Sequence, residues 1–172
     1  MNKKLISVLT TVSFLLILSA STLVAENVIS AEARYHSDHS VFEELPFGDG
    51  DISYGLAYEC HEESGYWQVG VDYAPDVSGI ESTDYVITPQ INLVFKDNIW
   101  RGGVGALSSY IHDEASGSNW SDLYWQLLVG VELPLFGIQL DLRTYYVFEE
   151  WKQLDEFDWD DLEFGAGLKF SF

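Results

Sequence analysis

The strongest constraint on the fold of this chain is an alternation of apolar and polar residues with a period of two. Successive side chains of a β-strand point to opposite faces, so this period predicts strands rather than helices. The clearest run places six apolar residues on one face: Leu123, Trp125, Leu127, Val129, Val131 and Leu133. Similar runs predict eight strands, at residues 29–38, 52–59, 67–73, 85–95, 100–110, 123–133, 138–148 and 162–172. The run at 29–38 is weakly apolar for a strand of this kind.

The connections between these strands alternate between short and long. Short ones fall near residues 61–65, 97–98 and 134–137, and longer ones near 39–50, 74–83, 112–121 and 150–160. This arrangement is typical of an antiparallel up-and-down meander, which closes into a barrel and so removes its edges. Pro89 lies in the middle of a predicted strand and lacks a backbone N–H, so we expect a local bulge or irregularity there.

The apolar face of the barrel is predicted to point outward. A soluble barrel turns its apolar face inward, whereas a membrane barrel turns it toward lipid. Hydrophobic residues make up 47% of the chain and aromatic residues 15%. The interior of an eight-stranded barrel is already filled by ordinary side chains, so it has no room for this many apolar and aromatic side chains. The aromatic residues gather at both ends of the strands, and the middle positions are mostly aliphatic. The sequence therefore predicts an all-β, eight-stranded antiparallel transmembrane β-barrel with two aromatic girdles.

At this point the chain resembles the small eight-stranded outer-membrane barrels of OmpA/OmpX type, over residues 29–172. The most specific feature is the last strand, LEFGAGLKFSF, which ends on Phe172. The resemblance implies that Phe172 is the signal read by the outer-membrane assembly machinery. It also implies that the protein lies in the cell outer membrane, in contact with outer-membrane lipid. No motif of a particular subfamily is present.

The N-terminus predicts export. Lys3 and Lys4 precede an apolar core at residues 5–18, and small residues up to Ala25 follow. This is the pattern of a signal peptide, so we expect a signal peptide at 1–25 and the barrel domain at 26–172. The formal charge of −20 argues against nucleic acid as a partner. The single cysteine, Cys60, excludes an intrachain disulfide framework and a zinc finger built on cysteines.

The polar face of the predicted strands carries charges into the barrel interior. Six of them are predicted to gather in the half nearest the short turns: Glu59, Arg101, Glu132, Asp141, Arg143 and Lys169. A salt-bridge plug is favoured over a charged filter in a porin-like conducting pore, because side chains fill an eight-stranded barrel. The predicted function is therefore structural or one of surface interaction through the loops, with the surface ligand unidentified. A narrow conduit for small solutes or hydrophobic molecules stays as an alternative.

The sequence predicts that the protein is not an enzyme. Hydrolysis of lipids would need a Ser, His and acid set. Residues 35–40 (YHSDHS) contain all three types, but neighbouring strand positions face opposite sides. A lipid hydrolase or acyltransferase is kept as the catalytic alternative.

The long connections are strongly acidic and predict a crowded negative rim. Divalent cations relieve such repulsion with oxygen ligands, so Ca²⁺ or Mg²⁺ is the one cofactor considered. The densest stretch supplies the metal-site candidates: Asp155, Glu156, Asp158, Asp160 and Asp161. A merely solvated acidic surface is the favoured alternative to a specific metal site.

Overall fold

The computed structural model describes residues 26–37, 45–75, 77–78, 83–113 and 117–172. The predicted signal peptide at 1–25 lies outside these residues, as do rim acids at positions 38, 43, 44, 76, 81 and 114. Within the described residues, no helix is both long and apolar enough to cross a membrane.

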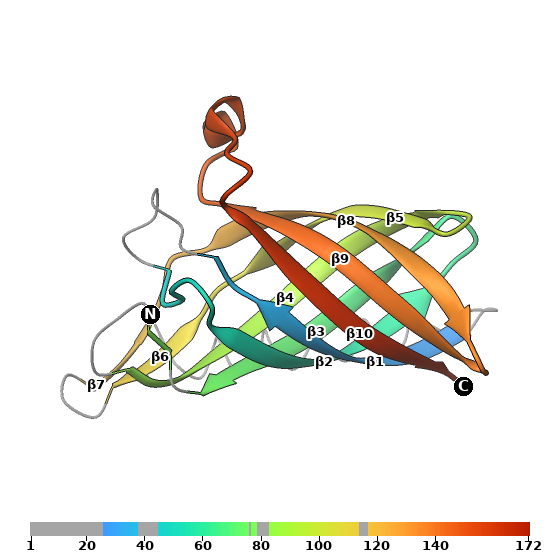
Figure 1. Ribbon diagram of the computed structural model, residues 1–172, viewed down its shortest axis with the longest axis horizontal. Helices are drawn as coiled ribbons and strands as arrows, with labels where there is room; N and C mark the ends of the chain where they lie inside the picture. Colours follow the sequence, from blue (N-terminus) through green and yellow to red (C-terminus); the bar gives the residue numbers. More distant parts are fainter. Residues whose placement is uncertain (1–25, 38–44, 76, 79–82, 114–116) are drawn as a thin grey trace, which may run out of the picture.

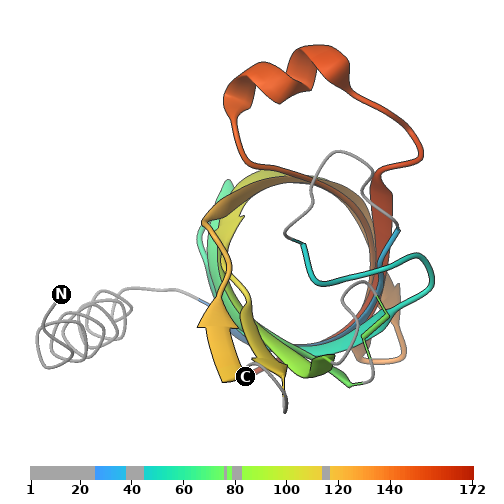
Figure 2. The same ribbon diagram turned by 90° about the vertical axis from the view of Figure 1, so that its left-hand side faces the viewer.

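The chain forms a closed antiparallel barrel (Figures 1 and 2). Its strands are β1 (Glu26–Tyr35), β2 (Ile52–His61), β3 (Gly65–Pro75), β4 (Thr83–Asp97), β5 (Trp100–Leu107), β6 (Tyr110–Asp113), β7 (Gly117–Trp120), β8 (Tyr124–Leu135), β9 (Ile138–Phe148) and β10 (Leu162–Ser171). β5 and β6 both pair with β4 and together form one strand of the ring. β7 and β8 pair with β6 and β5 and together form another, so the barrel is eight-stranded. β1 pairs with β10 and β3 pairs with β4, which leaves the ring without a free edge. The prediction of an eight-stranded antiparallel barrel is confirmed.

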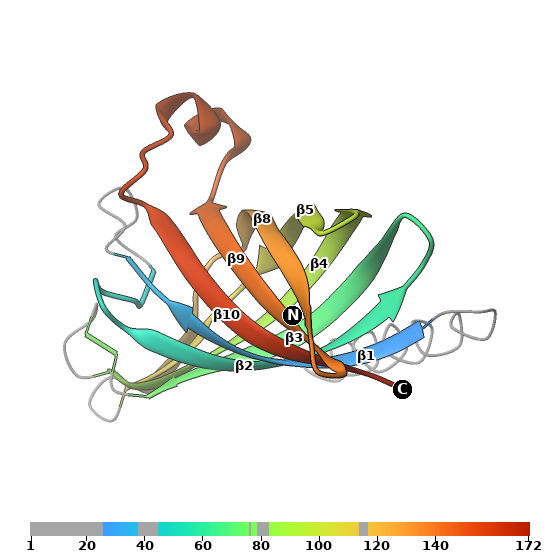
Figure 3. The ribbon, with the colours of Figure 1, turned by 45° about the vertical axis from the view of Figure 1, so that its right-hand side comes forward.

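The weakly apolar first strand is present, but it begins three residues earlier than predicted. It lies between β2 and β10 (Figure 3), pairing with β2 from Glu26 to Tyr35 and with β10 from Val28 to Tyr35. Two flanking strands supply backbone partners along its length, so hydrogen bonding on both sides compensates for its modest apolar content. Ile29 and Tyr35 are exposed and Arg34 is buried, which is the predicted orientation of the two faces.

The irregularity expected at Pro89 lies on one side of β4 only. Pairing with β3 runs without a break through Val71 and Pro89. On the other side, β5 ends at Leu107 and β6 starts at Tyr110, and the two ladders share one register. Opposite this gap, the Thr88 hydroxyl lies 2.8 Å from the Ser109 hydroxyl. The missing N–H of Pro89 therefore interrupts one ladder, and side-chain hydroxyls bridge part of the gap.

Two of the long connections that the sequence predicts as loops contain regular secondary structure. β6 and β7 pair with each other and extend a hairpin from the barrel end, where the sequence predicts a loop at residues 112–121. The connection between β9 and β10 contains the short 3₁₀ helix η1 (Trp151–Glu156). Figures 1 and 2 show that this connection projects sideways from the barrel wall, outside the ring of strands.

The two faces of the wall are sorted as the alternation predicts. In β8, the side chain of Val129 is 60% exposed, whereas that of its neighbour Leu128 is 1% exposed. The large apolar residues exposed on the strands include Ile29, Tyr54, Leu56, Val71, Tyr73, Ile91, Phe95, Trp100, Leu142, Phe164, Leu168 and Phe170. The buried residues are dominated by polar and charged side chains in the lumen. This is the orientation of a membrane barrel rather than a soluble one.

Candidate functional site

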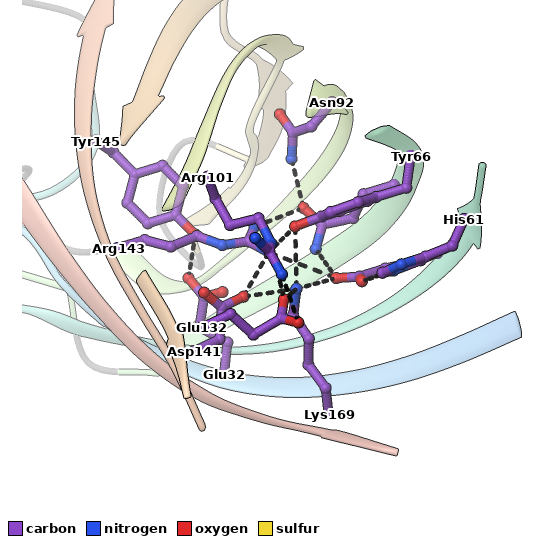
Figure 4. Close-up of polar contacts among 12 residues, drawn as sticks. Glu32, His61, Tyr66, Asn92, Arg101, Glu132, Asp141, Arg143, Tyr145 and Lys169 are labelled. Atoms are coloured by element: carbon purple, nitrogen blue, oxygen red, sulfur yellow. Dashed lines mark hydrogen bonds and ion pairs between the residues drawn. The ribbon is translucent and has the colours of Figure 1, made fainter. Parts of the chain in front are cut away.

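The candidate site is the lumen, and its half nearest the short turns holds the lumen charge cluster. This name denotes Glu59, Arg101, Glu132, Asp141, Arg143 and Lys169, the six charges that the sequence predicts there. All six are buried, and they come from β2, β5, β8, β9 and β10. Because each lies on the polar face of its strand, closure of the barrel points all of them inward. Figure 4 shows Arg101, Glu132, Asp141, Arg143 and Lys169 pointing toward one another.

Lys169 is the centre of this cluster. Its ammonium lies 3.1 Å from Glu59 Oε1, 2.9 Å from Glu132 Oε2 and 2.8 Å from Asp141 Oδ2. The Tyr66 ring also lies below it, with 4.7 Å between the Lys169 nitrogen and the ring centroid. The Lys169 side chain has no exposed area. A buried charge is tolerated only where partners replace its hydration, and here three carboxylates do so.

The two arginines complete the pairing of the acids. Arg101 binds Glu132 at 2.9 Å, and Arg143 contacts Asp141 at 2.5 Å and Glu59 at 3.5 Å. The cluster therefore contains three acidic and three basic residues, and all of its ion pairs except Arg143 with Asp141, which both lie on β9, join different strands. Such a network fills this half of the lumen and carries no formal net charge.

Neutral amides connect this cluster to the other half of the lumen. Gln68 donates to Glu59 at 2.7 Å, and Asn92 donates to Gln68 at 2.8 Å. Gln126 donates to Asn92 at 2.7 Å and accepts from Arg34 at 3.1 Å. These amides lie on the predicted polar faces, but sequence reasoning missed them as members of one hydrogen-bonded chain, because it followed charges only.

A second group of polar residues, the mouth cluster, lies at the end of the barrel with the long connections. It consists of Arg34 at the end of β1, His36 just after it, Ser53 at the start of β2 and Glu163 at the start of β10. Glu163 accepts from Arg34 at 2.5 Å and lies 3.0 Å from His36 Nδ1. His36 Nε2 lies 2.9 Å from the Ser53 hydroxyl. All four residues are buried.

Part of the connection between β1 and β2, residues 45–50, lies across the mouth, and we call it the mouth segment. Figure 2 shows this segment, in cyan, crossing the barrel opening. The Phe47 ring stacks on the His36 ring, with 3.8 Å between centroids and an interplanar angle of 9°. Leu45 packs on a different part of the wall, against Leu107, Tyr124 and Val147. Sequence reasoning missed both residues, because they belong to no alternating run.

The mouth segment is held by hydrogen bonds at its C-terminal end. The Asp51 carboxylate accepts from the Gly48 N–H at 2.8 Å, from the Ser78 N–H at 2.9 Å and from the Ser78 hydroxyl at 2.8 Å. Tyr35 donates to Asp49 at 2.8 Å. These bonds fix the segment to the rim of the barrel and to the connection between β3 and β4.

The predicted metal-site residues lie on the sideways connection between β9 and β10. Asp155, Asp158 and Asp160 are exposed, whereas Asp161 is buried. In the part of the chain that the structure describes, no three side chains of His, Cys, Asp or Glu come together as metal ligands; the side chain of Glu156 lies outside that part. The metal site at these residues stays a prediction.

Comparison with known proteins gives a structural similarity. No family model matches the chain, and no curated protein matches it. Among solved structures, the chain is similar to the crystal structure of Neisserial surface protein A (NspA). The identity is 16%, the TM-score is 0.48, and the match covers 86% of this chain and 97% of NspA. The barrel assignment for this chain rests on its own closed strand pairing.

Proposed function

We propose that this protein is an integral outer-membrane barrel, sealed to solutes, whose role is structural or one of interaction at the cell surface. The observation that carries the proposal is the inside-out barrel: an exposed apolar wall encloses a lumen of paired charges. Only lipid tolerates so large an apolar surface on a folded protein. Export by the predicted signal peptide and assembly through Phe172 belong to the same proposal.

The lumen is sealed at two levels, which argues against the alternative of a narrow conduit. The lumen charge cluster and the amides fill the half near the short turns, and the mouth segment covers the other end. A permeating ion would have to displace side chains that are bound to each other on several sides. The proposed role therefore requires no flow through the barrel.

The connection between β9 and β10 supports contact with the membrane surface. Because it projects sideways, it extends along the plane of a bilayer that surrounds the wall (Figures 1 and 2). Trp151 packs against Trp125 and Phe148, and Phe157 packs against Tyr146. Aromatic side chains favour the boundary between lipid and water. We infer that this connection rests on outer-leaflet lipid.

Fractionation tests the location of the protein. We expect it in the outer-membrane fraction, and we expect its gel mobility to change on heating, as for a barrel that stays folded in detergent. Recovery in the soluble fraction would refute the proposal.

Planar-bilayer recording tests the seal, with three variants as controls. We expect the parent protein, Phe47→Ala and Arg143→Ala each to give no stable conductance steps, because one seal remains in each. The double variant Phe47→Ala/Arg143→Ala should conduct. Regular conductance steps from the parent would refute the sealed barrel. A silent double variant that is folded would show that these residues are not the barrier.

A further inference from the structure

We propose that Ser53, His36 and Glu163 form a hydrolytic triad for acyl esters, covered in this structure by Phe47. This inference goes beyond the sealed-barrel role and departs from the prediction that the protein is not an enzyme. Its starting point is the order of contacts in the mouth cluster: hydroxyl to His36 Nε2 at 2.9 Å, and His36 Nδ1 to carboxylate at 3.0 Å. Nucleophile, base and orienting acid are linked in this order in serine hydrolases.

The hydrogen bonds fix the roles of the two ring nitrogens. The Glu163 carboxylate also binds Arg34, which is always charged, so it is an acceptor toward His36. In the neutral ring the proton is therefore on Nδ1, and Nε2 accepts from the Ser53 hydroxyl. This is the tautomer that a general base needs in order to remove the serine proton. Ser53 is the nucleophile, His36 is the base, and Glu163 is a positioning residue.

The three residues come from segments far apart in the sequence that barrel closure brings together. β1 pairs with both β2 and β10, and Arg34 lies opposite Ser53 on one side and Gly165 on the other. Residues at these three strand ends thus meet at one point of the rim. The sequence motif at residues 35–40 supplies His36 to this set, and its positions 38–40 lie outside the described residues.

The mouth segment occupies the space that a substrate would need. The cavity left beside His36 and Glu163 has a volume of only about 10 Å³, so no ester reaches Ser53 while the segment is in place. Phe47 packs against Ala74, Val77 and Val86 in the lumen mouth. If Phe47 and Leu45 move out, Phe47 vacates an apolar site beside His36, and Leu45 vacates a second apolar site against Leu107, Tyr124 and Val147. Those sites match the acyl chain of a lipid ester rather than a polar substrate.

The mouth segment is built so that it can move as a unit. Gly48 and Gly50 flank its acidic tip, and Gly50 has a φ of +93°, a conformation that glycine adopts without strain. The tip is held by the Asp51 carboxylate, by the bond from Tyr35 to Asp49 and by backbone bonds that join Gly50 and Asp51 to His36, so displacement needs the loss of these contacts. The segment is therefore a lid over the triad.

The reaction on an acyl ester follows from these positions. Ser53 Oγ attacks the carbonyl carbon and its proton passes to His36 Nε2. The bond from the carbonyl carbon to the alcohol oxygen breaks, and the alcohol leaves with that proton. Water then attacks the acyl-serine, again giving a proton to His36, and Ser53 Oγ departs with it. The net change is ester plus water to fatty acid plus alcohol.

A fluorophosphonate probe tests the triad, because it reacts covalently with activated serines. The full chain is refolded in detergent micelles, folding is checked by heat-dependent gel mobility, and labelled peptides are mapped by mass. We expect labelling at Ser53, and we expect Phe47→Ala to label about tenfold to hundredfold faster because its lid has lost the main apolar contact. His36→Ala should reduce the rate about a hundredfold or more. Ser109→Ala, which removes another buried lumen serine, should label like the parent.

Ester hydrolysis separates catalysis from simple reactivity. The Phe47→Ala protein should hydrolyse long-chain acyl esters, and Ser53→Ala in that background should not. Glu163→Gln in the same background should lower kcat with little change in KM, which a purely structural role would not produce in a folded barrel. Folded parent and Phe47→Ala proteins that leave Ser53 unlabelled overturn the triad. Hydrolysis of short-chain esters alone overturns the assignment of the vacated sites to an acyl chain. Neither outcome affects the sealed-barrel proposal, which conductance tests.

Discussion

Removal of the Lys169 ammonium tests whether the lumen charge cluster stabilises the barrel. In Lys169→Met the side chain keeps its bulk and loses its charge. Three carboxylates then lose a partner that lies between 2.8 and 3.1 Å away. Breaking a buried pair by deleting one partner costs about 3–5 kcal/mol.

The remaining contacts place the expected loss at the lower end of that range. Glu132 keeps Arg101, and both Asp141 and Glu59 keep Arg143. We therefore expect Lys169→Met to lower the free energy of unfolding by about 3 kcal/mol. The double variant Lys169→Met/Glu132→Gln restores a neutral cluster and should recover about 0.5–3 kcal/mol of that loss through coupling of the two sites.

The assay is urea unfolding of the protein in lipid vesicles, followed by tryptophan fluorescence and heat-dependent gel mobility. The free energy comes from linear extrapolation to zero urea. Lys152→Met is the matched control, because Lys152 is 76% exposed and pairs with Glu150 at the surface, where such a pair is worth about 0–1 kcal/mol. The reasoning fails if Lys169→Met destabilises the barrel no more than Lys152→Met does.

Three further predictions concern the wall, the C-terminus and the rim. Val129→Arg places a charge on the exposed face of β8 and should cost about 2–4 kcal/mol near the bilayer midplane; in the same unfolding assay, equal stability of this variant and the parent would mean that the faces are assigned wrongly. Gly130→Ala is the neighbouring lumen change, and its new Cβ would clash with the Leu142 backbone oxygen and lie 2.9 Å from Arg143 Cγ, so it should act by crowding alone. Deletion of Phe172, or Phe172→Asp, should leave export intact and reduce the amount in the outer membrane, as measured by fractionation and immunoblot; normal amounts would contradict the proposed assembly signal. Millimolar Ca²⁺ should protect the acidic connections from protease more than Na⁺ does at equal ionic strength. Equal protection by the two salts would mean that ionic screening explains the effect and that no metal is bound.

The alternating pattern is sufficient to determine the wall of the barrel. Period two is a property of each strand alone, so the sequence specifies that Val129 faces outward and that Lys169 and Glu132 face inward. The number of strands in the barrel follows from the number of alternating runs in the sequence. The break in the hydrogen-bond ladder opposite Pro89 is also determined by the local sequence, because proline has no backbone N–H to donate wherever its strand lies.

Tertiary structure decided which of these residues meet. Contacts across the lumen depend on the stagger of the strands and on barrel closure, which no local pattern encodes. His36 and Glu163 are 127 positions apart and become neighbours because β1 and β10 close the ring. The fold also placed Phe47 over His36: residues 45–50 follow no period, and their position depends on the apolar sites that the barrel mouth offers them. The sequence by itself thus determined the two faces of the wall, and the closed barrel determined the ion pairs, the lid and the triad beneath it.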